Sequence, residues 1–120
     1  MPRQPSKTFT DKELEIMRIV WRLGEASARM IQENLPGDRH YNTVMTIIRV
    51  LEKKNHLTHR EDGRTYLYRA TQSQDKARKR VLKHLIDHVF GGSATSLVLN
   101  LVETGDLTLK DLDAIRKKRP

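Results

Sequence analysis

The pattern of hydrophobic and polar positions predicts three helices in the first half of the chain. The first begins at Thr10, because Thr10 and Glu13 form a capping box in which both side chains satisfy free backbone amides. It ends at Gly24, the second begins near Ser27, and the third covers about residues 41–54. All three carry apolar residues at helical spacing: Leu14, Met17, Val20 and Trp21; Ala28, Ile31 and Leu35; Val44, Ile47, Ile48 and Leu51.

The periodicity changes after the third helix. Residues 57–60 and 65–70 are short runs rich in Thr, Tyr and Leu, and Asp62-Gly63 lies between them. An Asp-Gly pair between two such runs is a strong signal for a β-hairpin, since glycine adopts positive φ without steric cost. Three helices followed by a hairpin is the element order of a winged helix-turn-helix domain, and we predict this fold for residues 9–71.

The remainder of the chain predicts helices without a sheet, so the expected class is mainly α with a small β-hairpin. Glycines at 91–92 and 105 separate three short segments, each with one apolar face. Exposed apolar stripes usually mark a partner surface, and a second copy of the chain is the simplest partner. We therefore predict a helical dimerisation region over residues 72–120. Its expected contact residues are Val81, Leu85, Val89, Leu97, Leu101, Leu112 and Ile115.

The outward face of the third helix carries the candidate chemistry. At 100° per residue, a row of polar side chains lies opposite the apolar stripe. Asparagine can pair with adenine edges, arginine with guanine edges, and a threonine methyl can meet the thymine methyl in a major groove. Lys53, Lys54 and Arg60 are suited to phosphates, and Arg64 at the hairpin tip to a neighbouring groove or backbone. The predicted DNA-binding residues are Tyr41, Asn42, Thr43, Thr46, Arg49, Lys53, Lys54, Arg60 and Arg64.

Charge favours a polyanionic partner but does not locate its site. The formal net charge is +8. Residues 1–71 hold 13 basic and 9 acidic side chains and residues 72–120 hold 10 and 6, so each part carries +4. A polar face on an amphipathic helix is also an ordinary solvated surface. The alternative is therefore a winged-helix module that binds proteins, or nucleic acid without sequence preference.

Several other classes of function are not expected. The chain has no cysteine, which excludes disulfides, zinc fingers and thiolate sites, and no motif indicates an enzyme or a cofactor. His84 and His88 could share a metal at their spacing, but no third ligand is evident and we predict no metal site. No apolar run reaches the length of a membrane span. Residues 1–8 and 116–119 are expected to be disordered, and the protein to be cytoplasmic without membrane insertion.

Ordered motifs in both halves resemble the penicillinase-repressor (BlaI/MecI) family. Residues 41–55 look like its recognition helix, residues 10–21 like its opening helix, and Gly63-Arg64 like its wing. The tail motif of residues 96–102 is also similar, so the resemblance covers about residues 9–116. Asn55 stands where the family usually has glycine at the helix end, an acceptable exchange in a left-handed cap.

The resemblance implies a homodimeric transcriptional repressor that binds an inverted-repeat operator in double-stranded DNA. It also implies that the C-terminal helices form the dimer. In antibiotic-responsive members a membrane sensor protease pathway leads to cleavage within the dimerisation region, and the corresponding bond here is Asn100–Leu101. A cut inside a thin dimer core would remove the avidity that holds both half-sites.

Overall fold

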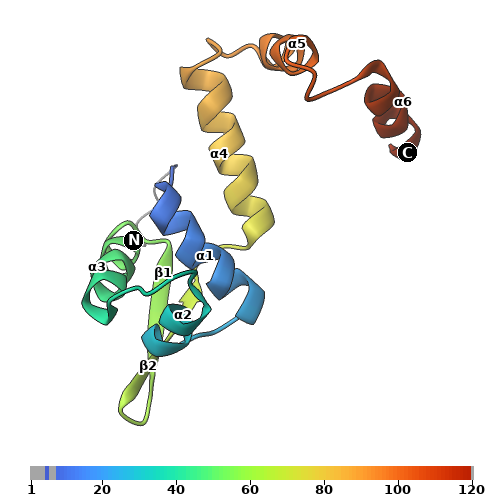
Figure 1. Ribbon diagram of the computed structural model, residues 1–120. Helices are drawn as coiled ribbons and strands as arrows, with labels where there is room; N and C mark the ends of the chain where they lie inside the picture. The colour runs from blue at the N-terminus through green and yellow to red at the C-terminus, as the bar shows by residue number, and fades with distance from the viewer. Residues whose placement is uncertain (1–4, 6–7, 120) are drawn as a thin grey trace. The chain divides into compact units, whose positions relative to one another are not determined.

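The computed structural model describes residues 5 and 8–119, so most of the predicted N-terminal arm (residues 1–4, 6 and 7) lies outside the described residues. The chain folds into helices and one antiparallel hairpin, which confirms the predicted class (Figure 1). In order the elements are α1 (Asp11–Leu23), α2 (Ala28–Asn34), α3 (Tyr41–Lys53), β1 (Leu57–Asp62), β2 (Thr65–Ala70), α4 (Gln74–His88), α5 (Ala94–Glu103) and α6 (Leu109–Lys118).

Internal contacts divide the chain into two units, residues 1–81 and 82–120. The division falls inside α4, after the predicted boundary at residue 71. The functional limits of the dimerisation region therefore stay a prediction. The expectation of a disordered basic tail is wrong over residues 116–118, because α6 continues to Lys118.

The hydrophobic core lies in the first unit. Helices α1, α2 and α3 gather around the hairpin β1–β2, which we call the wing, and its tip extends beyond α2 (Figure 1). A short bridge ties the wing to the α1–α2 connection, since Ala26 and Tyr68 exchange backbone hydrogen bonds of 3.0 and 2.8 Å. The core is built from Ile16, Met17, Ile19, Val20, Ala26, Ala28, Ile31, Leu35, Val44, Ile48, Leu51, Leu57 and Tyr68.

Local signals fix the ends of these elements. The Thr10–Glu13 capping box is present, with hydrogen bonds of 2.8 and 3.2 Å, and the Ser27 hydroxyl accepts from the Met30 amide. The hairpin pairs Asp62 with Thr65 and leaves a two-residue loop. In that loop Gly63 has φ +64°, whereas Asn55 is the one described non-glycine residue with positive φ. Gly63 alone in the left-handed region indicates a type II′ turn, which matches the twist of the strands.

The second unit has capped helices but no interior. Ser93 caps α5, and Thr108 and Asp111 form a capping box at α6. Among the described residues, no side chain beyond Ala77 is buried. Of the helices described, none is both long and apolar enough to cross a lipid bilayer.

Candidate nucleic-acid interface

Helix α3 presents two faces of opposite character, as its sequence predicts. Val44, Ile48 and Leu51 are at most 1% exposed and pack into the core. The opposite side chains reach solvent: Asn42, Thr43, Thr46, Arg49 and Lys53. The helix therefore offers a continuous row of amide, hydroxyl and cationic groups on an exposed surface.

The hydroxyl of Thr46 is already committed on one side. It donates a 2.9 Å hydrogen bond to the carbonyl oxygen of Asn42, one turn earlier in α3. The threonine therefore offers outward a methyl group and oxygen lone pairs, and no free donor. Thr46 is thus suited to contact a thymine methyl or to accept from an adenine or cytosine amino group.

The end of α3 is fixed by a left-handed cap. Asn55 has φ +67°, its amide bonds to the Glu52 carbonyl at 2.9 Å, and the His56 amide bonds to the Leu51 carbonyl at 2.8 Å. These two bonds form a Schellman motif, which satisfies carbonyls that the helix leaves free. The cap directs the chain from α3 into β1, and so sets the wing beside the exposed face of α3.

Two of the predicted phosphate contacts are held in ion pairs. Lys54 lies 2.9 Å from the buried carboxylate of Glu13, and Arg60 donates two 2.8 Å hydrogen bonds to Glu25. Burial alone would raise the pKa of Glu13, but the Lys54 and Thr10 hydrogen bonds outweigh burial and lower it. Hydrogen bonding from Arg60 likewise lowers the pKa of Glu25. Since these partners are 41 and 35 positions apart, helical spacing could not reveal the pairs.

Three other predicted cations remain uncommitted. Within residues 5 and 8–119, Arg49, Lys53 and Arg64 take part in no ion pair. All three are exposed, Arg49 and Lys53 on α3 and Arg64 at the tip of the wing. The interface therefore separates cations that hold the fold together from cations that are available to a ligand.

A cleft of about 460 Å³ opens between α3 and the wing. It is lined by Ser27, Ala28, Arg29, Tyr41, Met45, Arg64, Thr65, Tyr66 and Tyr68. The lining contains two arginines and three tyrosines but no carboxylate, so the cleft favours anions. The guanidinium of Arg29 sits 5.8 Å above the Tyr41 ring. The sequence gives no sign of Arg29, since nothing in its spacing brings the first turn of α2 beside that of α3.

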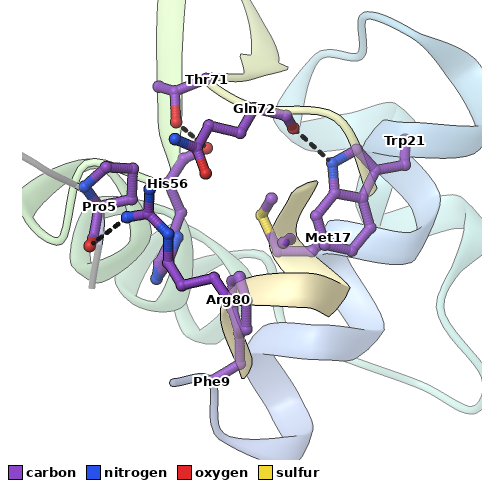
Figure 2. A pocket seen from close by; sticks show the side chains of 9 residues that line it. Pro5, Phe9, Met17, Trp21, His56, Thr71, Gln72 and Arg80 are labelled. Atoms are coloured by element: carbon purple, nitrogen blue, oxygen red, sulfur yellow. Dashed lines mark hydrogen bonds between the residues drawn. The ribbon is translucent and has the colours of Figure 1, made fainter. Parts of the chain in front are cut away.

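A small pocket lies between α1 and the first half of α4 (Figure 2). The Trp21 indole donates to the Gln72 carbonyl at 3.0 Å, and Arg80 donates to the Pro5 carbonyl at 3.0 Å. His56 is 4% exposed, stacks on Phe9 with ring centroids 4.0 Å apart, and leaves its Nε2 unpartnered. Burial lowers the pKa of His56 and favours the neutral ring. With a volume of about 10 Å³, the pocket has room for about one water molecule.

The two histidines of α4 pack on each other. The rings of His84 and His88 stack with centroids 4.1 Å apart, and Nδ1 of His88 lies 3.0 Å from the His84 carbonyl oxygen. Among the described residues, no group of three or more potential ligand side chains surrounds a metal-sized space. The two rings form a stack on α4 in which His84 is half-buried and His88 is exposed.

The predicted dimer residues lie on surfaces that this chain covers only in part. Val81, Val89 and Ile115 are 37%, 68% and 51% exposed. Leu85, Leu97, Leu101 and Leu112 are half-buried. The predicted scissile bond lies inside α5, where the Asn100 amide group donates to the Ser96 carbonyl at 2.9 Å.

Comparison with known proteins agrees with this architecture. A model of the penicillinase repressor family matches residues 9–118. The chain is 30% identical over 115 residues to the methicillin resistance regulatory protein MecI of Mammaliicoccus sciuri, across 92% of this chain and 94% of that protein. The penicillinase repressor of Staphylococcus aureus is 26% identical over 106 residues, across 87% of this chain and 84% of that protein. The penicillinase repressor of Bacillus licheniformis is 22% identical over 109 residues, across 89% and 85%. The chain therefore belongs to the penicillinase repressor family.

Proposed function

We propose that the protein is a transcriptional repressor that binds double-stranded DNA with sequence preference and performs no catalysis. One observation carries this proposal: α3 exposes a row of polar side chains that can contact base edges, opposite the buried residues Val44, Ile48 and Leu51. Family membership supports it, because relatives are named as a methicillin resistance regulator and as penicillinase repressors.

The exposed groups divide by chemistry into base contacts and phosphate contacts. Asn42, Thr43, Thr46 and Arg49 present groups that pair with base edges in a major groove. Tyr41, Lys53 and the wing-tip Arg64 suit the sugar–phosphate backbone, which positions a protein without reading sequence. Lys54 and Arg60 act mainly by fixing α3 and the wing, since both are held by carboxylates.

A mobility-shift titration tests sequence preference. The probe is the chain's own promoter region, with excess competitor DNA at about 0.15 M salt. A complex that survives competitor supports the proposal, and the absence of one overturns it. Thr46→Ala and Arg49→Ala are expected to lower the ratio of specific to non-specific affinity, each by about 1–3 kcal/mol. Lys53→Ala is the matched control and should weaken all sequences about equally; equal losses from all three variants favour the non-specific module.

The second unit supports a proposal that the working form is a homodimer on an inverted repeat. Within one chain its helices leave apolar side chains such as Val89 and Ile115 exposed. An isologous contact between two copies would bury the same patch on both. Ile115→Lys tests this with little harm to α6, because a cation suits the last turn of a helix. The substitution removes Ile115 from both copies, so the dimer dissociation constant measured by sedimentation equilibrium should rise by about a hundred-fold or more. An unchanged dimer would remove Ile115 from the interface.

Relief by proteolysis at Asn100–Leu101 is a further part of the proposal. Both residues lie in α5, so a protease of a membrane sensor pathway would act on a locally unwound turn. A cut there would separate α6 from the rest of the unit and weaken the dimer. After incubation with that protease, mass mapping should find fragments that end at Asn100 and begin at Leu101. An intact chain after this incubation would overturn the cleavage site.

A further inference from the structure

Three side chains form a contact path from α3 to the wing. Glu52 on α3 reaches His59 on β1, with Oε2 and Nδ1 only 2.7 Å apart. His59 in turn stacks on Tyr66 of β2, with ring centroids 4.3 Å apart and an interplanar angle of 20°. His59 therefore has its imidazole held at one edge by a carboxylate and covered on one face by a wing tyrosine.

Tyr66 forms part of the cleft that faces α3. It is 46% exposed and lines the cleft together with Tyr41 from the first turn of α3 and Arg64 from the wing tip. The His59 stack determines where the Tyr66 ring lies, because the two residues are diagonal neighbours on one face of the hairpin. The position of that cleft wall thus depends on a contact that begins at Glu52.

We propose that His59 is a positioning residue that fixes the wing against α3 through Glu52 and Tyr66, and that its protonation tightens DNA binding. This inference rests on the proposed function, since it concerns how the same interface is held ready for DNA. Charge on the imidazole would turn its hydrogen bond with Glu52 into an ion pair and would add a cation to the stack with Tyr66. A wing that is already ordered loses less entropy when it binds.

The surroundings of His59 support a charge-dependent contact. The titratable groups that contact it are Glu52 from α3 and Tyr66 and Tyr68 from β2. The charge of Arg49 on α3 acts on Tyr68, the neighbour of His59 in the wing. Glu61 lies two residues further along the same face of β1. Histidine is the side chain whose charge ordinarily changes between pH 5 and 8. DNA affinity should therefore rise as the pH falls through this range.

The test compares pH profiles of DNA affinity in the full-length protein. The probe is a duplex that the wild-type protein selects from a random-sequence pool, measured at pH 6, 7 and 8 and constant ionic strength. The variants are Glu52→Gln and His59→Phe, which keep the shape of the contact but remove its charge. Glu61→Gln is the matched control, because it removes a wing carboxylate that does not touch His59. The other four histidines are present in every variant and contribute equally.

The wild type and Glu61→Gln are expected to bind more tightly at pH 6 than at pH 8. Glu52→Gln and His59→Phe should lose about two- to five-fold of that ratio, the range of a partly exposed ion pair. In NMR spectra, the Tyr66 ring protons should shift with pH in the wild type and Glu61→Gln but not in His59→Phe, which removes the titratable ring of the stack. Profiles that are the same in all four proteins overturn the inference and leave the proposed function intact. Failure to select any duplex overturns both.

Discussion

The two units differ in what covers their hydrophobic side chains. In the first, α1 to α3 and the wing bury residues such as Val20, Ile31 and Ile48 completely. In the second, α5 and α6 contain no buried residue, and Leu99 and Leu109 are 55% and 75% exposed. One unit encloses its core within a single chain, and the other has helices without an interior.

The difference separates forming a helix from packing it. Side-chain caps at Ser93 and Thr108 define where α5 and α6 begin. Isolated helices of about ten residues are nevertheless marginal in water, so their stability comes mainly from tertiary contacts. In the proposed homodimer, a second copy of the chain supplies those contacts to the second unit. Loss of that dimer would leave the core of the first unit intact, because this core lies within one chain.

The largest expected effect on folding comes from Ile48→Ala. Ile48 is 0% exposed at the centre of the first unit, and a buried Ile→Ala change leaves a cavity that costs about 2–5 kcal/mol. Urea unfolding followed by Trp21 fluorescence measures this loss, since Trp21 is the single tryptophan and lies in α1. The result would confirm that the first unit depends on its own core.

Ile115→Ala is the matched control for that comparison. It makes the same chemical change on a helix surface that is 51% exposed, where substitutions usually alter stability by about 0.5 kcal/mol or less. The Trp21 transition should be nearly unchanged in dilute solution. Equal losses from Ile48→Ala and Ile115→Ala would contradict the distinction between a covered and an uncovered unit.

A smaller effect should come from acid, and it should act on the first unit. Burial lowers the pKa of folded His56 below its ordinary 6.5, so between these two values the unfolded chain binds more protons. The free energy of unfolding should therefore fall as the pH drops from about 6.5. Burial alone would raise the pKa of Glu13. Its hydrogen bonds with Lys54 and Thr10 outweigh that effect and lower the pKa below 4.5. Its stabilisation is complete above pH 4.5 and is lost at more acid pH.

Urea midpoints reported by Trp21 between pH 3 and pH 8 would show both limbs. His56→Leu should flatten the loss that begins near pH 6.5, and Glu13→Gln the loss below pH 4.5. In the second unit, hydrogen bonds with Thr108 lower the pKa of Asp111 at the exposed start of α6. Protonation of Asp111 should weaken this cap and should not move the Trp21 midpoint, which reports on the first unit. A Trp21 midpoint that stays constant from pH 8 to pH 4 would refute the assignment to His56.

How far the sequence predicts this protein depends on the range of each interaction. The Thr10 cap, the buried side of α3 and the Gly63 turn follow from residues within a few positions of each other, and those predictions are confirmed. The predicted stripe of α1 is only partly right, because Ile16 and Ile19 are buried whereas Leu14 and Trp21 are half-buried. Burial of Val44 and Ile48 opposite the polar face of α3 follows from the same periodicity.

Contacts between distant segments could not be predicted in this way. The phosphate contacts of Lys54 and Arg60 stay a prediction, but only the structure shows that these cations also pair with Glu13 and Glu25. Arg29 lines the cleft because α2 packs against α3. The spacing of residues within either helix does not predict that contact. Which cations form ion pairs within the chain is thus a property of tertiary structure, while the presence of Arg49 and Lys53 on the exposed side of α3 follows from the sequence.

The smallest expected effects on stability come from substitutions of the left-handed residues that follow α3 and α5. Asn55 ends α3 with φ +67° and Gly105 follows α5 with φ +83°, so a left-handed residue follows each of these two helices. Asn55→Ala should cost about 1 kcal/mol in the Trp21 transition, because alanine lacks the short polar side chain that lets asparagine adopt the left-handed conformation. Asn55→Gly should change it by about 0.5 kcal/mol or less, since relief of strain opposes the greater freedom of unfolded glycine. Gly105→Ala should leave the Trp21 transition unchanged and lower helicity measured by circular dichroism. A shift of the Trp21 midpoint in Gly105→Ala would mean that the ends of α5 and α3 are coupled, and that the covered unit depends on the uncovered one.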